Sequence, residues 1–109
     1  PVILAKIPVK HAWEIFAYLP FGGWNDCPGT EELMAVTKYW EERCGAWPST
    51  MSHDELEFFL PAPVPENSAL ELALEHYGFC PDVYQGGDYP LGALADSLSR
   101  SKIWYFWWD

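Results

Sequence analysis

The chain ends in five consecutive aromatic residues, Trp104-Tyr105-Phe106-Trp107-Trp108, followed by Asp109. Five adjacent rings left in water would form an adhesive tail, and burying one large apolar side chain is worth roughly 1.5–3 kcal/mol. A free terminus also frays unless tertiary contacts hold it. We therefore expect residues 103–107 to form a closing strand that docks into a sheet and completes the core.

The composition indicates one globular domain and excludes a disordered segment. Half of the 109 residues are hydrophobic and 17% are aromatic, with seven tryptophans, which is enough for a single core. No signal peptide is visible, and no apolar stretch approaches the ~20 residues that cross a bilayer. Because the sequence begins with Pro1, we expect residues 1–109 to be the C-terminal domain of a longer protein.

The charge limits the classes of partner. Six Lys and Arg residues stand against 16 Asp and Glu residues, for a formal net charge of −10. Such a chain repels nucleic-acid phosphates and anionic membrane surfaces, so we expect neither as a partner. A basic protein, a cation and simple solubility remain as interpretations of the charge. The three cysteines, without a secretory context, indicate thiols in a reducing cytoplasm.

Hydrophobic periodicity and turn residues predict most of the elements. The expected order is a strand at 1–7, an ambiguous segment at 11–19, a structured loop at 20–29, a helix at 30–44, strands at 46–51 and 55–60, a helix at 66–77, a short helix at 91–98 and a strand at 103–107. Thr30 is the expected N-cap of its helix, Gly45 the residue after it, and Gly78 the end of the next helix.

Without the short helix at 91–98, the order of elements is βαββαβ. This order predicts an α+β ferredoxin-like sandwich, with a mainly antiparallel four-stranded sheet and helices on one face. The short helix is then an addition before the last strand. The sequence leaves the oligomeric state open.

Several motifs spread over nearly the whole chain are specific in combination. They are Pro20-Phe21-Gly22-Gly23-Trp24-Asn25-Asp26-Cys27-Pro28, Tyr39-Trp40, Cys44-Gly45-Ala46, Phe79-Cys80-Pro81-Asp82 and Trp104-Tyr105-Phe106-Trp107-Trp108-Asp109. Together they resemble the bacterial DUF4253 family. The resemblance implies a bacterial domain of about this length, often at the C-terminus of a protein, whose function is unassigned. It implies no catalytic residues.

Two loops have related sequences, Asp26-Cys27-Pro28 and Cys80-Pro81-Asp82. Cys27 lies just before the helix at 30–44, whose dipole would lower the pKa of a thiol. That position allows a nucleophilic or redox cysteine. A small buried thiol is the simpler interpretation, because no basic residue lies close in sequence to favour the thiolate.

Other catalytic patterns have little support in the sequence. No C-x-x-C or H-x-x-x-H spacing occurs, so no metal and no cofactor is expected. The run Ser52-His53-Asp54 is consecutive and falls in a turn, whereas a working triad is assembled from separate elements. Glu66, Glu71 and Glu75 are expected on a solvated helix face. Enzyme activity stays open and is not favoured.

The remaining pattern is aromatic and acidic. Tryptophan and tyrosine are favoured at protein interfaces, and aromatic faces beside carboxylates suit an arginine or lysine of a partner. We therefore predict a non-catalytic protein-binding module, an immunity-type or regulatory domain that masks a basic protein. The alternatives are an enzyme or small-ligand domain at the two loops, and a purely structural domain. The candidate site residues are Trp24, Asn25, Asp26, Cys27, Cys80, Pro81, Asp82, Trp107, Trp108 and Asp109.

Overall fold

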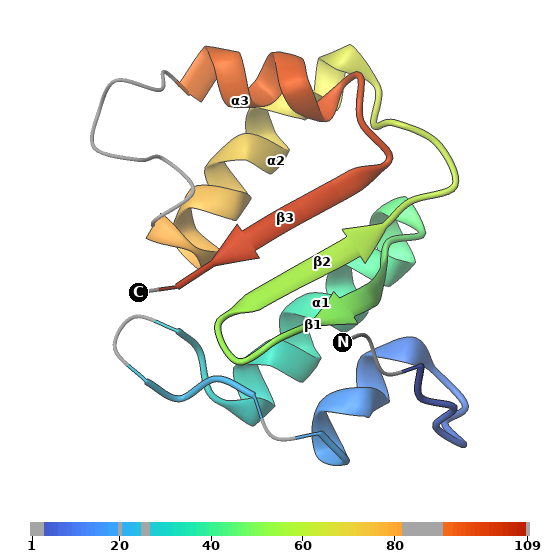
Figure 1. The fold of residues 1–109 in the computed structure, drawn as a ribbon. Helices are drawn as coiled ribbons and strands as arrows, with labels where there is room; N and C mark the ends of the chain where they lie inside the picture. The colour runs from blue at the N-terminus through green and yellow to red at the C-terminus, as the bar shows by residue number, and fades with distance from the viewer. Residues whose placement is uncertain (1–3, 20, 25–26, 82–90, 109) are drawn as a thin grey trace.

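The helices and strands follow the predicted order from residue 30 onward. The computed structural model describes residues 4–19, 21–24, 27–81 and 91–108. In these ranges the chain forms the 3-10 helix η1 (Ala12–Ala17), α1 (Thr30–Cys44), β1 (Trp47–Met51), β2 (Glu55–Phe59), α2 (Glu66–Phe79), α3 (Leu91–Leu98) and β3 (Ile103–Trp107) (Figure 1). None of the described helices is both long enough and apolar enough to pass through a membrane.

The described strands form one antiparallel sheet in the order β1-β2-β3. Strands β1 and β2 are joined by the turn at residues 52–54, and β1 carries a bulge between Pro48 and Thr50. Strand β2 pairs with β3 along its whole length, from Glu55 opposite Trp107 to Phe59 opposite Ile103. The predicted closing strand and the α+β class are therefore confirmed.

The predicted four-stranded ferredoxin-like sandwich is wrong, because the sheet within the described ranges has three strands. Residues 4–7 of the predicted first strand have no regular structure, and Leu4 is 98% exposed. In a βαββαβ unit the first strand lies between the third and the fourth. Here β2 bonds directly to β3, so that place in the sheet is taken. An apolar segment forms a strand only where a pleated, half-buried neighbour accepts it.

Helix α1 begins at Thr30 and has Gly29 as its N-cap, so the predicted capping role of Thr30 is wrong by one residue. Its C-terminal end agrees with the prediction. Gly45 adopts a left-handed backbone with φ of 73°, and its N–H donates to the carbonyl oxygen of Glu41 at 2.9 Å. This is the usual way in which a glycine satisfies the last carbonyls of a helix.

Helix α2 continues past its predicted end. Gly78 lies inside the helix, which ends at Phe79, and the N–H of Cys80 donates to the carbonyl oxygen of His76 at 2.8 Å. Phe79 is buried in the core. The prediction that Gly78 ends the helix is wrong because burial of the Phe79 ring stabilises the additional residues more than a single glycine destabilises them.

The core lies between one face of the sheet and helices α1 and α2. The indole of Trp40 on α1 is at its centre, 1% exposed. Its ring packs at centroid distances of 5.0 to 5.6 Å against the rings of Phe58, His76, Phe79, Trp104 and Phe106. Trp104, Phe106 and Trp108 are each at most 1% exposed. Three of the five terminal rings are therefore buried.

The opposite face of the sheet is not covered by a described helix. Figure 1 looks onto this face, with α1 behind the strands. Because side chains alternate along a strand, residues at every second position of β2 and β3 point outward. We call this surface the open sheet face and define it by Trp47, Glu55, Glu57, Phe59, Ile103, Tyr105 and Trp107.

Candidate functional site

The structure brings Cys27 and Cys80 near each other in the core, with the Cys80 thiol on the Trp107 backbone, but the described members of the predicted site do not form one exposed site. Asn25, Asp26, Asp82 and Asp109 lie outside the described residues. Cys27, Cys80 and Trp108 are buried. Trp24 is half-buried, with its ring edge-on to Phe21 at 5.2 Å, and Pro81 is exposed. Trp107 belongs to the open sheet face. The candidate set is thus divided between the core and two parts of the surface.

The thiol of Cys27 is held in its protonated form. Burial raises its pKa to about 12; a hydrogen bond from the backbone of Gly23 lowers it less, and the nearby Cys80 raises it further. The helix dipole proposed to activate this thiol is therefore outweighed by desolvation. The thiol of Cys80 donates to the carbonyl oxygen of Trp107 at 3.1 Å. Both sulfurs thus belong to the packed interior.

The backbone beside Cys27 is close-packed at Gly22. This residue has a left-handed φ of 84°, and a Cβ there would lie 2.1 Å from the carbonyl oxygen of Pro28 and 2.8 Å from a methyl carbon of Leu33. Only glycine fits both constraints. The loop is therefore built to bring the start of α1 against the core, and Cys27 packs beneath it.

We call the loops at residues 26–28 and 80–82 the two Cys-Pro loops. Residues at or beside these loops meet at a groove between α1 and α2. We call it the interhelical groove; it has a volume of about 290 Å³ and is lined by Pro28, Glu32, Val36, Tyr39, Trp40, Glu75, Gly78 and Phe79. Pro28 comes from the first loop, and Phe79 immediately precedes the second. Most of the lining is aliphatic or aromatic, which is usual for a site that takes a small organic ligand.

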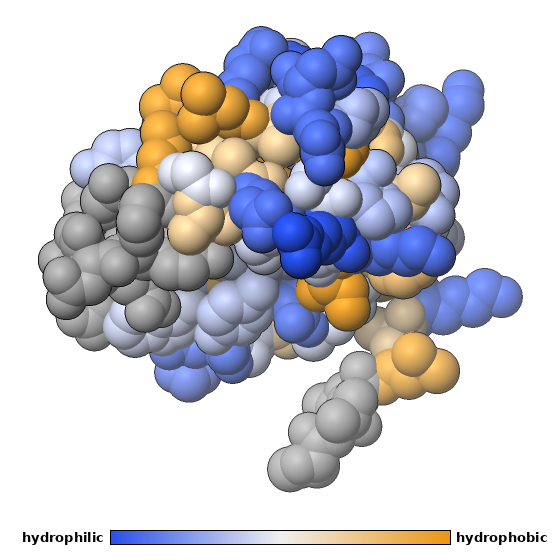
Figure 2. All heavy atoms as spheres, turned by 90° about the horizontal axis from the view of Figure 1, so that it is seen from above, coloured by the Kyte–Doolittle hydropathy of each residue, from blue (hydrophilic) through white to orange (hydrophobic). Residues whose placement is uncertain are grey.

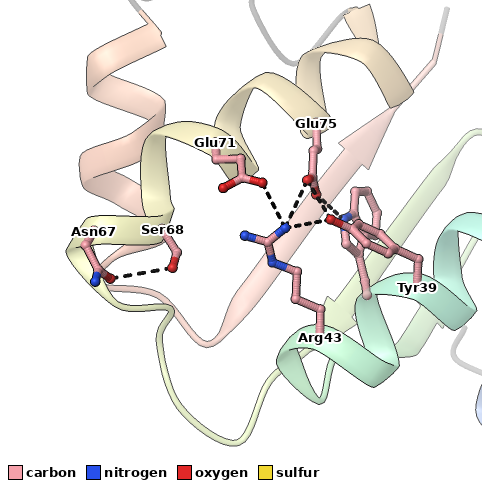
Figure 3. A network of polar contacts seen from close by, with 7 residues as sticks. Tyr39, Arg43, Asn67, Ser68, Glu71 and Glu75 are labelled. Atoms are coloured by element: carbon pink, nitrogen blue, oxygen red, sulfur yellow. Dashed lines mark hydrogen bonds and ion pairs between the residues drawn. The ribbon is translucent and has the colours of Figure 1, made fainter.

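A network of polar contacts joins α1 and α2 beside Glu75 in the lining of this groove (Figure 3). Glu75 on α2 accepts hydrogen bonds from the Tyr39 hydroxyl at 2.8 Å and from the Trp40 indole at 3.0 Å. Arg43 on α1 pairs with Glu71 at 3.0 Å and with Glu75 at 3.4 Å. Glu71 lies on an exposed helix face as expected, Glu75 is more buried, and both also join the two helices.

The open sheet face concentrates aromatic and acidic side chains. Its large apolar members, Trp47, Phe59, Ile103, Tyr105 and Trp107, are between 36% and 52% exposed. Trp47 and Phe59 are direct cross-strand neighbours, with ring centroids 5.1 Å apart. Glu57 lies opposite Tyr105 and Glu55 lies opposite Trp107. The result is a row of exposed apolar side chains, four of them aromatic, with carboxylates beside them.

A hollow of about 400 Å³ marks one end of this face. It is lined by His53, Asp54, Glu55, Tyr105 and Trp107, and we call it the acidic hollow. The Trp107 indole donates to Asp54 Oδ2 at 3.0 Å, and the Tyr105 hydroxyl donates to Glu55 Oε2 at 2.5 Å. The carboxylate of Asp54 in the β1–β2 turn and that of Glu55 at the start of β2 are therefore oriented by two aromatic donors from β3.

The acidic hollow carries a negative potential. The pKa of Tyr105 is raised to about 12, first because its hydroxyl donates to Glu55 and then through burial and the charges of Glu55, Asp54 and Glu57. Within the described ranges, no three His, Cys, Asp or Glu residues are placed to hold a metal ion. The site therefore presents oriented carboxylates and ring faces, without a metal cluster among the residues described.

Sequence reasoning found Trp107 and missed Asp54, Glu55 and Tyr105. The sequence holds a signal for Glu55 and Tyr105 in the alternation of side chains along each strand. One strand alternates at Glu55, Glu57 and Phe59, and the other alternates at Ile103, Tyr105 and Trp107. Each pattern predicts which residues share a face. Neither predicts that the two strands pair, and only the β2–β3 register brings the acids beside the rings.

Comparison with known proteins identifies a family. A family model described as "Domain of unknown function (DUF4253)" matches residues 3–109 of the chain. No curated protein and no solved structure matches the chain. The match covers far more than half of the chain, so the motifs noted in the sequence all lie within the matched residues.

Proposed function

The chain belongs to the DUF4253 family of domains of unknown function, and we propose that it is a non-catalytic protein-binding module whose open sheet face docks onto a basic partner protein. The observation that carries this proposal is the row of exposed side chains at Trp47, Phe59, Ile103, Tyr105 and Trp107. Contiguous apolar surface with a polar rim is typical of an interaction site, and tryptophan and tyrosine dominate binding hot spots.

The charge favours a basic partner over a second copy of the chain. Asp54, Glu55 and Glu57 lie among or beside the exposed rings, and the whole chain has a net charge of −10. Two open sheet faces brought together would oppose these carboxylates, and like charges placed face to face cost several kcal/mol. A partner with Lys and Arg residues would instead be steered toward the site.

The side seen in Figure 2, from above the view of Figure 1, shows many hydrophilic residues, with apolar residues in one larger group and at several other points. Such a mixed, charged surface supports solubility and does not require a partner. The open sheet face, with the aromatic pair Trp47–Phe59 and the exposed rings of Tyr105 and Trp107, is the surface that we assign to binding.

We extend the proposal to an immunity-type or regulatory domain in a bacterial cytoplasm. The support for the immunity-type or regulatory role is the charge, the small size and the lack of a catalytic pattern in the sequence; the family resemblance supports a bacterial origin, and the state of the thiols supports the cytoplasm. Cys27, Cys44 and Cys80 all lie within the described ranges and are not joined by disulfides, which agrees with a reducing compartment.

Site-specific photo-cross-linking in the native cells tests the docking proposal. A photoreactive p-benzoylphenylalanine replaces Ile103 on the open sheet face, and a matched control replaces the exposed Glu42 on α1. We expect the Ile103 position to cross-link a basic protein that the Glu42 position does not. With that protein purified, Trp47→Ala should weaken binding about tenfold. Identical products from both positions, or none from Ile103, would contradict the proposal.

The interhelical groove supports a second candidate function, a small-ligand or enzyme site next to the two Cys-Pro loops. The specific observation is that Pro28 and Phe79, which border those loops, line the same groove. A Cβ at Gly78 meets no atom within 4 Å, and the same holds for Gly92 on α3. Gly78→Leu therefore fills the groove, and Gly92→Leu is the matched control outside it.

Thermal-shift screening with these two variants tests the second candidate. A ligand of the groove should raise the Tm of the wild type and of Gly92→Leu, and it should lose this effect in Gly78→Leu. Cys27→Ser tests the role of the thiol in the same way. Ligands that stabilise all of the variants equally would argue against a site in the groove.

A further inference from the structure

The acidic hollow at residues 53–55, 105 and 107 has the chemistry of a site for one kind of side chain. Resting on the proposed docking function, we infer that this hollow receives an arginine side chain of the partner protein, with its guanidinium between the carboxylates of Asp54 and Glu55 and the rings of Tyr105 and Trp107. Three features support this inference: the orientation of the carboxylates, the absence of a lysine or arginine paired with them among the described residues, and the shape of the group that fits them.

The two carboxylates are held in place before a partner arrives. Trp107 and Tyr105 each donate to one of them from β3. On the other side, the Ser52 hydroxyl donates to Glu55 Oε1 at 3.0 Å. An ionised carboxylate has about four acceptor positions, so these donors orient the groups and leave capacity for charged donors. Orientation in advance reduces the entropy cost of binding.

The protein itself does not neutralise these acids with a lysine or arginine. In the described part of the chain, the ion pairs of Arg43 and Arg100 are with other acids, and Asp54 pairs only with the exposed His53 at 3.5 Å. The pKa of Tyr105 is raised first by the hydrogen bond to Glu55 and by burial, and then by the charges of Glu55, Asp54 and Glu57. Among the described residues, a cation from outside therefore meets two carboxylates that no lysine or arginine occupies, with the exposed His53 as the one neighbouring group that pairs with Asp54.

The surroundings favour a guanidinium over an ammonium ion. A guanidinium is planar, carries five donors in a fork that matches carboxylates, and stacks on aromatic faces. Tyr105 and Trp107 alternate on β3 and are 47% and 36% exposed, so their rings remain available for stacking and cation–π contact. An ammonium ion is a compact, strongly hydrated charge and uses fewer of these features.

Three peptides of equal length test the inference on the unaltered protein. In these peptides glycine alternates with arginine, lysine or citrulline, the last being the uncharged analogue of arginine. Binding is followed through the indole N–H NMR signal of Trp107, assigned with Trp107→Phe. We expect the arginine peptide to shift this signal and to bind about tenfold tighter than the lysine peptide. The citrulline peptide should leave the signal unchanged.

Variants locate the binding. Asp54→Asn with Glu55→Gln should weaken the arginine peptide about tenfold. Glu31→Gln with Glu42→Gln removes the same charge from exposed positions on α1 and should change affinity by less than about twofold. Tyr105→Phe keeps the ring and removes the donor to Glu55, so it should reduce the preference for arginine over lysine.

The results separate this inference from the docking proposal. Equal affinity for the arginine and lysine peptides, or no loss in the Asp54→Asn/Glu55→Gln protein, would overturn the arginine site. The arginine site would also be overturned if a partner cross-linked from Ile103 still binds the Asp54→Asn/Glu55→Gln protein. In that case the proposed docking function would remain supported. If the double variant does not fold, the comparison of the three peptides on the wild type and on Tyr105→Phe still tests the arginine site.

Discussion

His76 is a titratable side chain in the middle of the aromatic core. It is 2% exposed and is surrounded by the rings of Trp40, Trp104 and Phe106, at centroid distances of 4.4 to 5.0 Å. Its Nε2 has no hydrogen-bond partner among the described residues. The place of His76 on the apolar face of α2 agrees with its burial in the core.

Burial of His76 makes the stability of the protein depend on pH. Desolvation lowers the pKa of His76 to about 3 from the ordinary 6.5. Between these two pH values the unfolded chain binds a proton at this residue and the folded chain does not. The neutral, buried ring therefore makes its full contribution to the free energy of unfolding above pH 6.5, and this contribution decreases as the pH falls below that value. Between pH 7 and pH 5 the loss amounts to about 2 kcal/mol.

Urea unfolding at both pH values measures this loss. We expect His76→Leu to lose less free energy of unfolding than the wild type over the same pH interval. His53→Leu removes a histidine whose side chain is 91% exposed, and it should keep the loss seen in the wild type. Equal losses in His76→Leu and the wild type would show that carboxylates elsewhere cause the acid sensitivity.

Cys27 and Cys80 should resist alkylation in the folded protein. A thiolate is the reactive form, and burial raises the pKa of Cys27 to about 12. We expect iodoacetamide at mildly alkaline pH to modify neither residue in the native state and both after unfolding in urea. Peptide mass spectrometry identifies the modified positions. Rapid native labelling of Cys27 would restore the case for a reactive cysteine.

At the scale of elements, glycine has opposite roles at the ends of α1 and α2. Gly45 has a left-handed φ of 73°, and a Cβ there would lie 3.3 Å from the ring of Pro61. Gly78 lies inside α2, and its Cβ would meet nothing within 4 Å. The first glycine is required by the backbone and the second is not.

This contrast predicts effects of opposite sign for one substitution. Gly45→Ala should destabilise the protein by roughly 1–2 kcal/mol, because a left-handed backbone is unfavourable for alanine. Gly78→Ala should stabilise it by roughly 0.5–1 kcal/mol, because alanine is the better helix former. Chemical unfolding of both variants measures the difference. A destabilised Gly78→Ala protein would mean that α2 does not continue through this position in solution.

At the scale of the whole molecule, the dominant property is the net charge of −10. Self-repulsion of this size destabilises the compact state and attracts basic partners. Both effects act through water near the surface, so dissolved salt screens them. The same change in salt should therefore affect folding and binding in opposite directions.

Raising NaCl from about 0.01 M to about 0.15 M shortens the screening length from roughly 30 Å to roughly 8 Å. We expect the free energy of unfolding to rise, by on the order of 1 kcal/mol, since repulsion among the acids is reduced. Binding of the arginine peptide should weaken over the same range. Chemical unfolding and NMR titration measure the two effects. A fall in stability with salt would show that favourable ion pairs such as Arg43–Glu71 outweigh the repulsion.

The helices, the hairpin and the closing strand follow from the sequence because their signals are local. Periodic apolar residues predict α1 and α2, and the alternation in Glu55–Phe59 predicts β2. The terminal rings require a buried strand, and Trp104, Phe106 and Trp108 are indeed at most 1% exposed. Each of these outcomes depends on the residues of one segment and on the cost of leaving apolar surface in water.

Only the tertiary structure decided the strand count and the composition of the acidic hollow. The apolar segment at the N-terminus has the residues of a strand, but β3 pairs with β2 and occupies the place it would need. The same pairing sets Tyr105 and Trp107 beside Glu55 and Asp54, about 50 residues away in sequence. A strand exists only with its partner and in its register, and no local pattern specifies either one.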